Sequence, residues 1–290
     1  MKKLILVFFL IIAVSSFAQE AEENPYAWKT SVEASLSMTQ AAYSDNWTGG
    51  EVGSIVWASN LHGIAQKQLS DLWKWENDLK LAFGQTHNQN KETKQWSEPD
   101  KSTDKIRFDS ILKLTLNSLV DPYAAFVLES QWYDASFADK NLYFSPLELT
   151  ESAGASRTWY EKGTERFATR LGFGLRQYFV KVYDPGTEET TTETANDGGI
   201  EFVADYMEKV NESLSYTSKL TLFQALFYSE SDADTEDLWK SLDMAWENIL
   251  TARVTKIVQV SLAWELVYDE QQSNAGQFKE TLALGVGWVF

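Results

Sequence analysis

The chain has 290 residues, no cysteine, five prolines and a formal net charge of −17. The lack of cysteine excludes a disulfide framework, and the acidic balance argues against a nucleic-acid partner, whose phosphates need Lys and Arg for neutralisation. Aromatic residues make up 14% of a chain whose mean hydropathy is −0.32. A chain that is aromatic-rich yet polar on average suits strands whose alternate residues face two different environments.

The N-terminus predicts a cleaved signal peptide over residues 1–18. Lys2 and Lys3 form a positive segment, residues 4–14 are apolar, and Ser16 and Ala18 are the small residues of a cleavage site. The apolar run is too short to cross a bilayer as a helix. We therefore expect export of the mature chain, with residues 19–27 as a short periplasmic segment before the main domain at 28–290.

From Trp28 onwards the sequence alternates between apolar and polar residues. Even positions from Trp28 to Met38 are mostly apolar and odd positions from Lys29 to Thr39 are polar. A period of two indicates a β-strand with two different faces, whereas a helix needs apolar spacings of three and four. The pattern recurs along the chain and predicts twelve strands. Their ranges are 28–40, 52–65, 72–86, 105–118, 123–136, 147–160, 165–180, 199–210, 214–229, 238–250, 257–269 and 277–290.

The length of these tracts favours a membrane protein. Strands of soluble proteins have about 5–6 residues, whereas strands that cross a bilayer at a tilt need about 9–11. The connectors after even-numbered strands are short, and most of those after odd-numbered strands are longer and polar, notably 41–51, 87–104, 181–198 and 230–237. This asymmetry is typical of short periplasmic turns and long outer loops. We predict an all-β fold, an antiparallel up-and-down transmembrane β-barrel of about 12 strands with both termini in the periplasm. The boundaries are least defined over 137–165 and 181–210.

Aromatic residues on the outward-facing positions gather towards strand ends, as the two interfacial girdles of a barrel would require. Near the predicted periplasmic ends they are Trp28, Trp73, Trp75, Tyr123, Tyr216 and Trp288. Towards the outer ends they are Trp57, Phe83, Trp132, Tyr228 and Tyr268.

The last strand alternates to the end of the sequence. Its outward residues are Leu282, Leu284, Val286, Trp288 and Phe290. An aromatic-rich final strand that ends in Phe resembles the C-terminal signal read by the barrel assembly machinery. The signal peptide and this strand together predict the outer membrane of a Gram-negative bacterium, with membrane lipid and the assembly machinery as partners.

The sequence resembles a Bacteroidota family of outer-membrane barrel-like proteins classed only as a domain of unknown function. Four motifs carry the resemblance: 46–51 (NWTGGE), 75–84 (WENDLKLAFG), 103–106 (TDKI) and 277–282 (QFKETL) with 285–287 (GVG). The resemblance implies a location and a fold, and it supplies no catalytic residue, ligand or partner.

The inward-facing positions carry both signs of charge. The cations are Lys74, Lys80, Arg107, Lys113, Arg166, Arg170, Arg176, Lys219 and Lys279. The anions are Glu33, Glu76, Asp78, Asp109, Glu129, Glu201, Asp205, Asp243, Glu247 and Glu265. One interpretation is a set of ion pairs that brace the wall, and the other is the lining of a selective channel. The three arginines of the seventh strand would then form an anion-attracting ladder.

The sequence does not support an enzyme, a metal or a cofactor. A 12-stranded outer-membrane phospholipase uses Ser, His and Asn, but neither His62 nor His87 has a Ser two residues further on, as that motif requires. Two distant histidines without cysteine make a zinc site improbable. The acidic segment 229–237 lacks the glycine-turned spacing of a calcium loop and is expected to be solvated loop charge.

The leading functional prediction is therefore a passive narrow pore or small-solute channel. The alternative is a closed structural or accessory barrel that docks an unknown protein partner through its outer loops. A wide lumen with cations on one wall would favour the channel. A lumen crossed by paired charges, or plugged by the 87–104 loop, would favour the accessory role.

Overall fold

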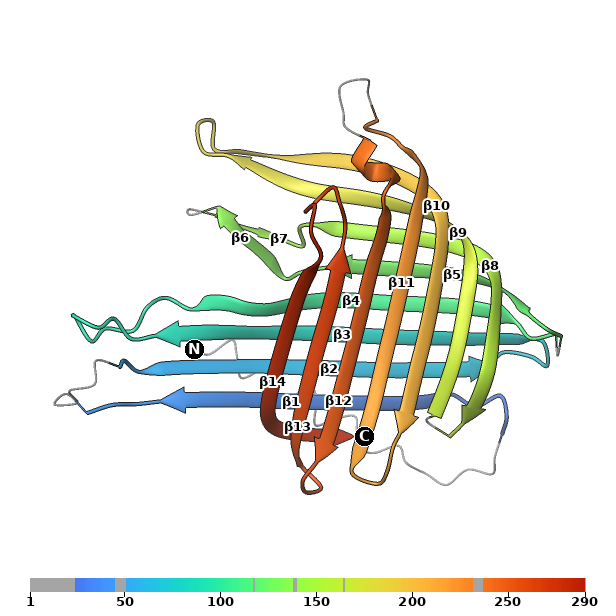
Figure 1. Ribbon diagram of the computed structural model, residues 1–290, viewed down its shortest axis with the longest axis horizontal. Coiled ribbons are helices and arrows are strands. Elements are labelled where there is room, and N and C mark those ends of the chain that lie inside the picture. The colour runs from blue at the N-terminus through green and yellow to red at the C-terminus, as the bar shows by residue number, and fades with distance from the viewer. Residues whose placement is uncertain are drawn as a thin grey trace.

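A computed structural model of the chain describes residues 24–44, 51–116, 118–137, 140–163, 165–231 and 237–289. Twelve antiparallel strands form one closed barrel (Figure 1). Their bounds are β1 Lys29–Ala41, β2 Ser54–Gln68, β3 Trp73–Asn88, β4 Asp100–Leu114, β5 Asp121–Ser130, β8 Leu147–Lys162, β9 Glu165–Asp184, β10 Glu189–Lys209, β11 Leu214–Tyr228, β12 Leu242–Arg253, β13 Val258–Tyr268 and β14 Gln277–Val289. The predicted fold class is confirmed, and each of the twelve predicted strands overlaps a strand of the barrel.

The topology is up-and-down. Each strand pairs with its neighbours in the sequence, except that β5 pairs directly with β8, and β14 pairs with β1 to close the sheet. A separate two-stranded hairpin, β6 (Tyr133–Phe137) and β7 (Lys140–Tyr143), is inserted between β5 and β8. The predicted fifth strand at 123–136 is therefore too long, because the barrel strand ends at Ser130 and the chain turns into this hairpin.

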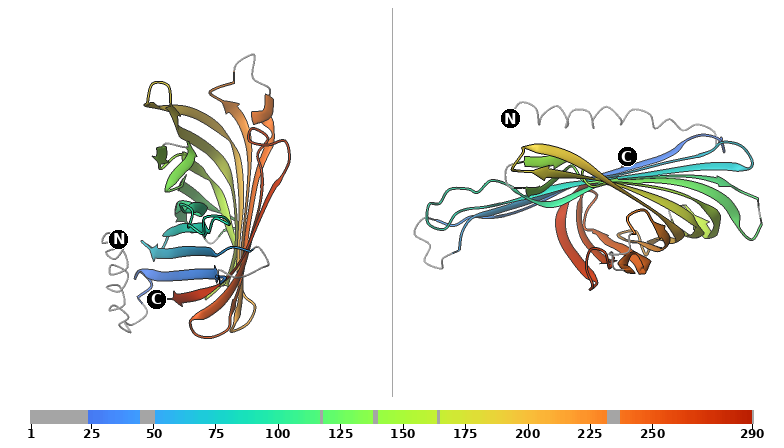
Figure 2. Two further views of the ribbon diagram at one scale, coloured as in Figure 1. Left: turned by 90° about the vertical axis from the view of Figure 1, so that its left-hand side faces the viewer. Right: turned by 90° about the horizontal axis from the view of Figure 1, so that it is seen from above.

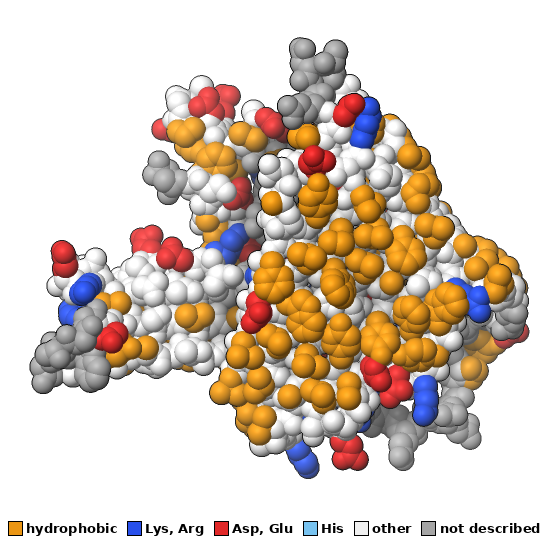
Figure 3. Space-filling view, in the orientation of Figure 1, with side chains coloured by type: hydrophobic (Ala, Val, Ile, Leu, Met, Phe, Trp, Pro, Cys, Tyr) orange, Lys and Arg blue, Asp and Glu red, His pale blue; other side chains and the backbone are white. Residues whose placement is uncertain are grey.

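The barrel is flattened, so that β1 to β4 run across one layer and β11 to β14 cross them steeply in the other (Figure 1). The outer face of the second layer is covered by hydrophobic side chains (Figure 3). Many of the outward-facing apolar side chains are more than a third exposed, among them Leu171, Phe173, Leu226, Trp246 and Leu282. Such a wall is stable only against lipid, which makes the barrel a membrane-spanning one.

A row of aromatic rings runs round the outside from the short turn between β8 and β9. Trp159, Phe167, Tyr206, Tyr216 and Trp264 follow one another with ring centroids 5.9 to 6.1 Å apart. Rings of this kind anchor a barrel at the level of the lipid headgroups.

The predicted position of Tyr123 in this girdle is wrong. Its side chain faces the interior, only 5% exposed, beneath the guanidinium of Arg170. Tyr123 and Glu129 are six positions apart on one regular strand, so they must share a face, and Glu129 faces inwards to Arg107.

The predicted outer loop at 181–198 is also wrong, because most of it is strand. β9 and β10 continue as a paired hairpin up to Asp184 and Glu189. β8 pairs with β9 only as far as Phe179, and β11 pairs with β10 only from Asp197. The hairpin therefore extends beyond its neighbours at the end of the barrel opposite the start of β1 and the end of β14. Its threonines at 190–192 have a high intrinsic preference for strands, which outweighs their lack of apolar alternation.

The predicted signal peptide and Phe290 lie outside the described residues, as does most of the 46–51 motif. In the part of the chain that the structure describes, no helix is long and apolar enough to cross a membrane.

Among the described residues, the joint between β1 and β14 is the shortest ladder in the barrel. It has five residue pairs, from Glu33–Val289 to Ser37–Gly285, whereas the next shortest ladder, between β4 and β5, has eight. Gly285 allows the two strands to meet, since a Cβ there would lie 2.5 Å from the Leu36 carbonyl oxygen. Beyond this point the two strands diverge, and Figure 2 (left) shows only the C-terminal end of β14 bending to run beside β1.

Cysteine pairs can test this divergence cleanly in a chain with no cysteine. Leu36→Cys with Val286→Cys joins two registered partners and is expected to form a disulfide, which needs Cα atoms about 4.4–6.8 Å apart. Met38→Cys with Leu284→Cys lies one step further along the same face, where no pairing exists between the described strands. We expect little cross-linking there under the same oxidation, measured by gel mobility. Equal cross-linking of the two pairs would contradict the divergence of β1 and β14 beyond the Ser37–Gly285 pair.

Candidate functional site: a charged network inside the barrel

The interior of the barrel holds ion pairs at three levels. The charged residues occupy alternate positions along each strand. The strand register places them side by side on neighbouring strands, with Lys80 opposite Arg107 and Arg107 opposite Glu129. Because side chains of a strand alternate between two faces, this set shares the inner face.

At the first level Glu76 of β3 is bound by three cations. Its carboxylate accepts from Lys113 Nζ of β4 at 2.7 Å and Arg166 Nη2 of β9 at 3.0 Å. Lys74 Nζ lies 2.9 Å from its other oxygen and also contacts Glu161 of β8 at 3.2 Å. The side chains of Glu76 and Lys113 are 7% and 8% exposed, so this charge is satisfied by protein groups rather than by bulk water.

At the second level Asp109 of β4 holds two cations. Arg107 donates to it from Nε at 2.7 Å and Nη2 at 3.0 Å, and Lys219 Nζ of β11 donates at 2.9 Å. The remaining arm of Arg107 bonds to Glu129 of β5 at 2.7 Å. Asp109 is 3% exposed, which makes this the most enclosed carboxylate of the second level.

Several of these contacts cross the lumen. β4 and β12 are six strands apart in either direction round the closed sheet of twelve. Lys105 of β4 nevertheless contacts Glu247 of β12 directly, and Lys80 of β3 lies 4.0 Å from the same carboxylate. The Lys219–Asp109 pair joins strands that are five apart. Side chains from opposite walls therefore meet in the middle of the barrel, which is possible only because the barrel is flattened.

At the third level, nearer the extended β9–β10 hairpin, Arg176 of β9 binds two carboxylates. Its Nη2 donates to Asp197 of β10 at 2.5 Å and to Asp243 of β12 at 2.8 Å. The guanidinium also lies over the ring of Phe223, 3.6 Å from its centroid. Tyr178 adds a hydroxyl bond to Asp197 at 3.3 Å.

The three arginines of β9 do not form a free ladder. Arg166 is bound to Glu76 and Arg176 to Asp197 and Asp243, while Arg170 has Glu201 at 3.7 Å. Of the other predicted residues, Asp78 Oδ1 accepts from His62 Nε2 at 3.0 Å, and Glu265 lies opposite Glu247 and Lys279 in the register.

Sequence reasoning missed three members of the network: Lys105, Glu161 and Asp197. Lys105 has the parity of Arg107 but stands where the predicted strand begins, and Asp197 has the parity of Glu201 but fell in a predicted loop. Following the alternation from Arg107 back to Lys105, and from Glu201 back to Asp197, would have found both. Glu161 lies next to the turn after β8, at the end of the predicted pattern.

The two histidines lie on neighbouring strands, His62 on β2 and His87 on β3. His62 is occupied by Asp78, and His87 pairs in register with Ile55 at the outer end of β3. Across the described residues, no group of three or more His, Asp or Glu side chains is arranged to hold a metal ion.

A model of the family described as "Protein of unknown function (DUF3078)" matches residues 38–135. That range covers less than half of the chain and contains three of the four motifs that carry the predicted resemblance, at 46–51, 75–84 and 103–106. The similarity is to a family without an assigned function. No curated protein matches the chain.

Solved structures of similar shape are outer-membrane barrels. The COG4313 outer membrane channel from Pseudomonas putida F1 is 15% identical with a TM-score of 0.41, over 93% of this chain and 99% of that chain. The translocator domain of the autotransporter NalP from Neisseria meningitidis is 11% identical with a TM-score of 0.37, over 99% and 96%. The NanC porin is 9% identical with a TM-score of 0.35, over 90% and 98%. Because these identities and TM-scores are low, the fold class is assigned from the strand register of the chain itself.

Proposed function

We propose that this chain is an outer-membrane barrel whose lumen is closed by its own side chains, and that it acts as an accessory barrel through its outer rim. The observation that carries the proposal is the contact between Lys105 and Glu247, which joins opposite walls. A passive pore needs a continuous path of water, and its charged lining would be largely exposed. The inner charges here are instead mostly enclosed and paired, with Asp109 and Lys113 at 3% and 7% exposure.

The outer rim supplies surfaces that a partner could use. The β6–β7 hairpin packs against the extended β9–β10 hairpin. The ring centroids of Phe137 and Tyr183 are 6.0 Å apart, and Lys181 Nζ donates to the Tyr143 carbonyl oxygen at 2.7 Å. Tyr143 and Phe144 are 59% and 52% exposed on this pair of hairpins. Exposed aromatic residues on a braced support are typical of protein-binding surfaces.

Conductance of the purified protein in planar bilayers tests the proposal. We expect no steps above bare lipid from protein that shows the heat-modifiable gel migration of a folded barrel. Steady conductance steps from the folded wild-type protein would contradict the closed lumen and restore the passive pore. The proposal includes the cleaved signal peptide at 1–18, the assembly signal that ends in Phe290, and the Bacteroidota origin suggested by the motifs.

A further inference from the structure

Arg170 on β9 is the one inner arginine of that strand without a hydrogen-bonded carboxylate among the described residues. It is 5% exposed, and its Nε, Nη1 and Nη2 atoms all lack a hydrogen-bond partner. The nearest carboxylate oxygen, Glu201 Oε2, is 3.7 Å from Nε and is itself unpartnered. A buried guanidinium has five N–H groups, and leaving them all unsatisfied is strongly unfavourable.

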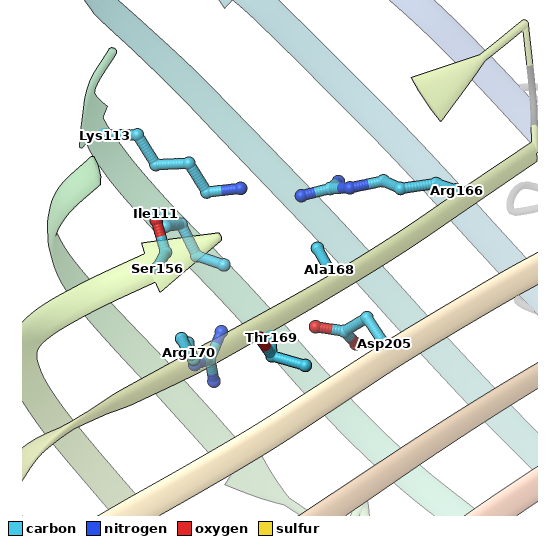
Figure 4. Close-up of a pocket in the computed structure, with 8 residues that line it drawn as sticks. All are labelled: Ile111, Lys113, Ser156, Arg166, Ala168, Thr169, Arg170 and Asp205. Carbon is cyan, nitrogen blue, oxygen red and sulfur yellow. The ribbon is translucent and has the colours of Figure 1, made fainter. Parts of the chain in front are cut away.

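A small cavity of about 10 Å³ adjoins this guanidinium. Three cations line it, Lys113, Arg166 and Arg170, against one carboxylate, Asp205. In Figure 4 the ammonium of Lys113 and the guanidinium of Arg166 point towards each other, with Arg170 and Asp205 at the other side. The space is about that of one water-sized particle.

The unsatisfied groups around this cavity are mainly donors. Besides the three nitrogens of Arg170, the buried Nε of Arg166 has no partner. Lys and Arg side chains can only donate, so an occupant that only accepts would complement them best. A water molecule would present hydrogens as well as lone pairs. A halide accepts from every direction, and its negative charge suits the guanidinium of Arg170, because Lys113 and Arg166 are already bound to Glu76.

We propose that this cavity is a binding site for a small monovalent inorganic anion of chloride size, held by Arg170 with Arg166 and Lys113. Phosphate or a carboxylate is too large for the space. The site does not depend on the proposed role of the barrel, because a bound anion would fix the wall whether or not the lumen conducts. A bound anion would accept the hydrogen bonds that Arg170 does not donate to Glu201.

Bromide tests the site directly in the wild-type protein. Crystals of the full-length chain grown or soaked in bromide are expected to show an anomalous peak in contact with Arg170. In detergent, the unfolding midpoint of the wild-type protein should rise with the logarithm of chloride concentration, relative to gluconate at equal ionic strength, since a ligand that binds only the folded state stabilises it.

A matched pair of variants tests whether the chloride-dependent rise of the unfolding midpoint depends on Arg170. Arg170→Met should lose the chloride-dependent shift, and Arg253→Met, at the exposed end of β12, should keep it. If Arg170→Met does not fold, the bromide peak in the wild-type protein decides. The absence of a bromide peak together with equal midpoints in chloride and gluconate would mean that the cavity holds water only, and would overturn the proposal.

Discussion

Replacing Glu76 with glutamine is expected to destabilise the barrel by about 3–5 kcal/mol, the range found when one partner of a buried ion pair is removed. Three cations converge on this carboxylate within 3.0 Å: Lys74, Lys113 and Arg166. A glutamine keeps the shape of the side chain but presents an amide group, which donates, to at least one of these donors. Like charges would then face one another in a space from which water is largely excluded.

The measurement is the urea midpoint and the heat-modifiable gel transition of protein refolded in detergent micelles. Glu92→Gln, an exposed change of the same chemistry in the 87–104 segment, is the control and should behave as wild type. Combining Glu76→Gln with Lys113→Met should cost less than the sum of the single changes, because one of the stranded cations is removed with its partner. A Glu76→Gln midpoint equal to that of the control would show that water satisfies the three cations.

The alternation of the sequence was sufficient to predict the barrel, because lipid on one side and packed polar groups on the other impose a period of two on each strand. Leu112 and Leu114 face out and Lys113 faces in for this reason alone. Where neither environment acts, the pattern disappears, and the β9–β10 extension beyond the barrel was accordingly predicted as a loop. There the strand is held by pairing with its own partner, from Asp184–Glu189 onwards.

Parity assigns a side chain to a face, but it gives neither its height in the barrel nor its partner. Lys105 and Glu247 are 142 residues apart and meet only because the barrel is flattened and the two strands cross. That geometry depends on the stagger of all twelve strands, which no single segment encodes. The near balance of inner charges supported ion pairing as one of two interpretations. The identity of each pair required the closed sheet.

Removing two of the pairs that cross the lumen, Lys105–Glu247 and Lys219–Asp109, is expected to convert a closed barrel into a conducting one. The four substitutions are Lys105→Ser, Asp109→Ser, Lys219→Ser and Glu247→Ser. They delete two cations and two anions, so the net charge is unchanged while four long side chains leave the middle of the barrel. Arg107 keeps its bond to Glu129 along the wall and is not left unpaired. A 12-stranded barrel is wider than the eight-stranded kind that side chains alone fill, so the vacated space should hold a path of water.

Single-channel recordings in planar bilayers would follow the change, with resolvable steps expected from the quadruple variant and none from wild type. The control carries four serines in the exposed segment at Lys91, Glu92, Lys94 and Glu98, which removes the same numbers of charges outside the barrel. Because the deleted inner charges cancel, the new conductance should show weak preference between cations and anions. A quadruple variant that migrates as a folded barrel and stays silent would mean that the remaining groups, such as Arg176 and its two carboxylates at the outer level, are enough to close the lumen.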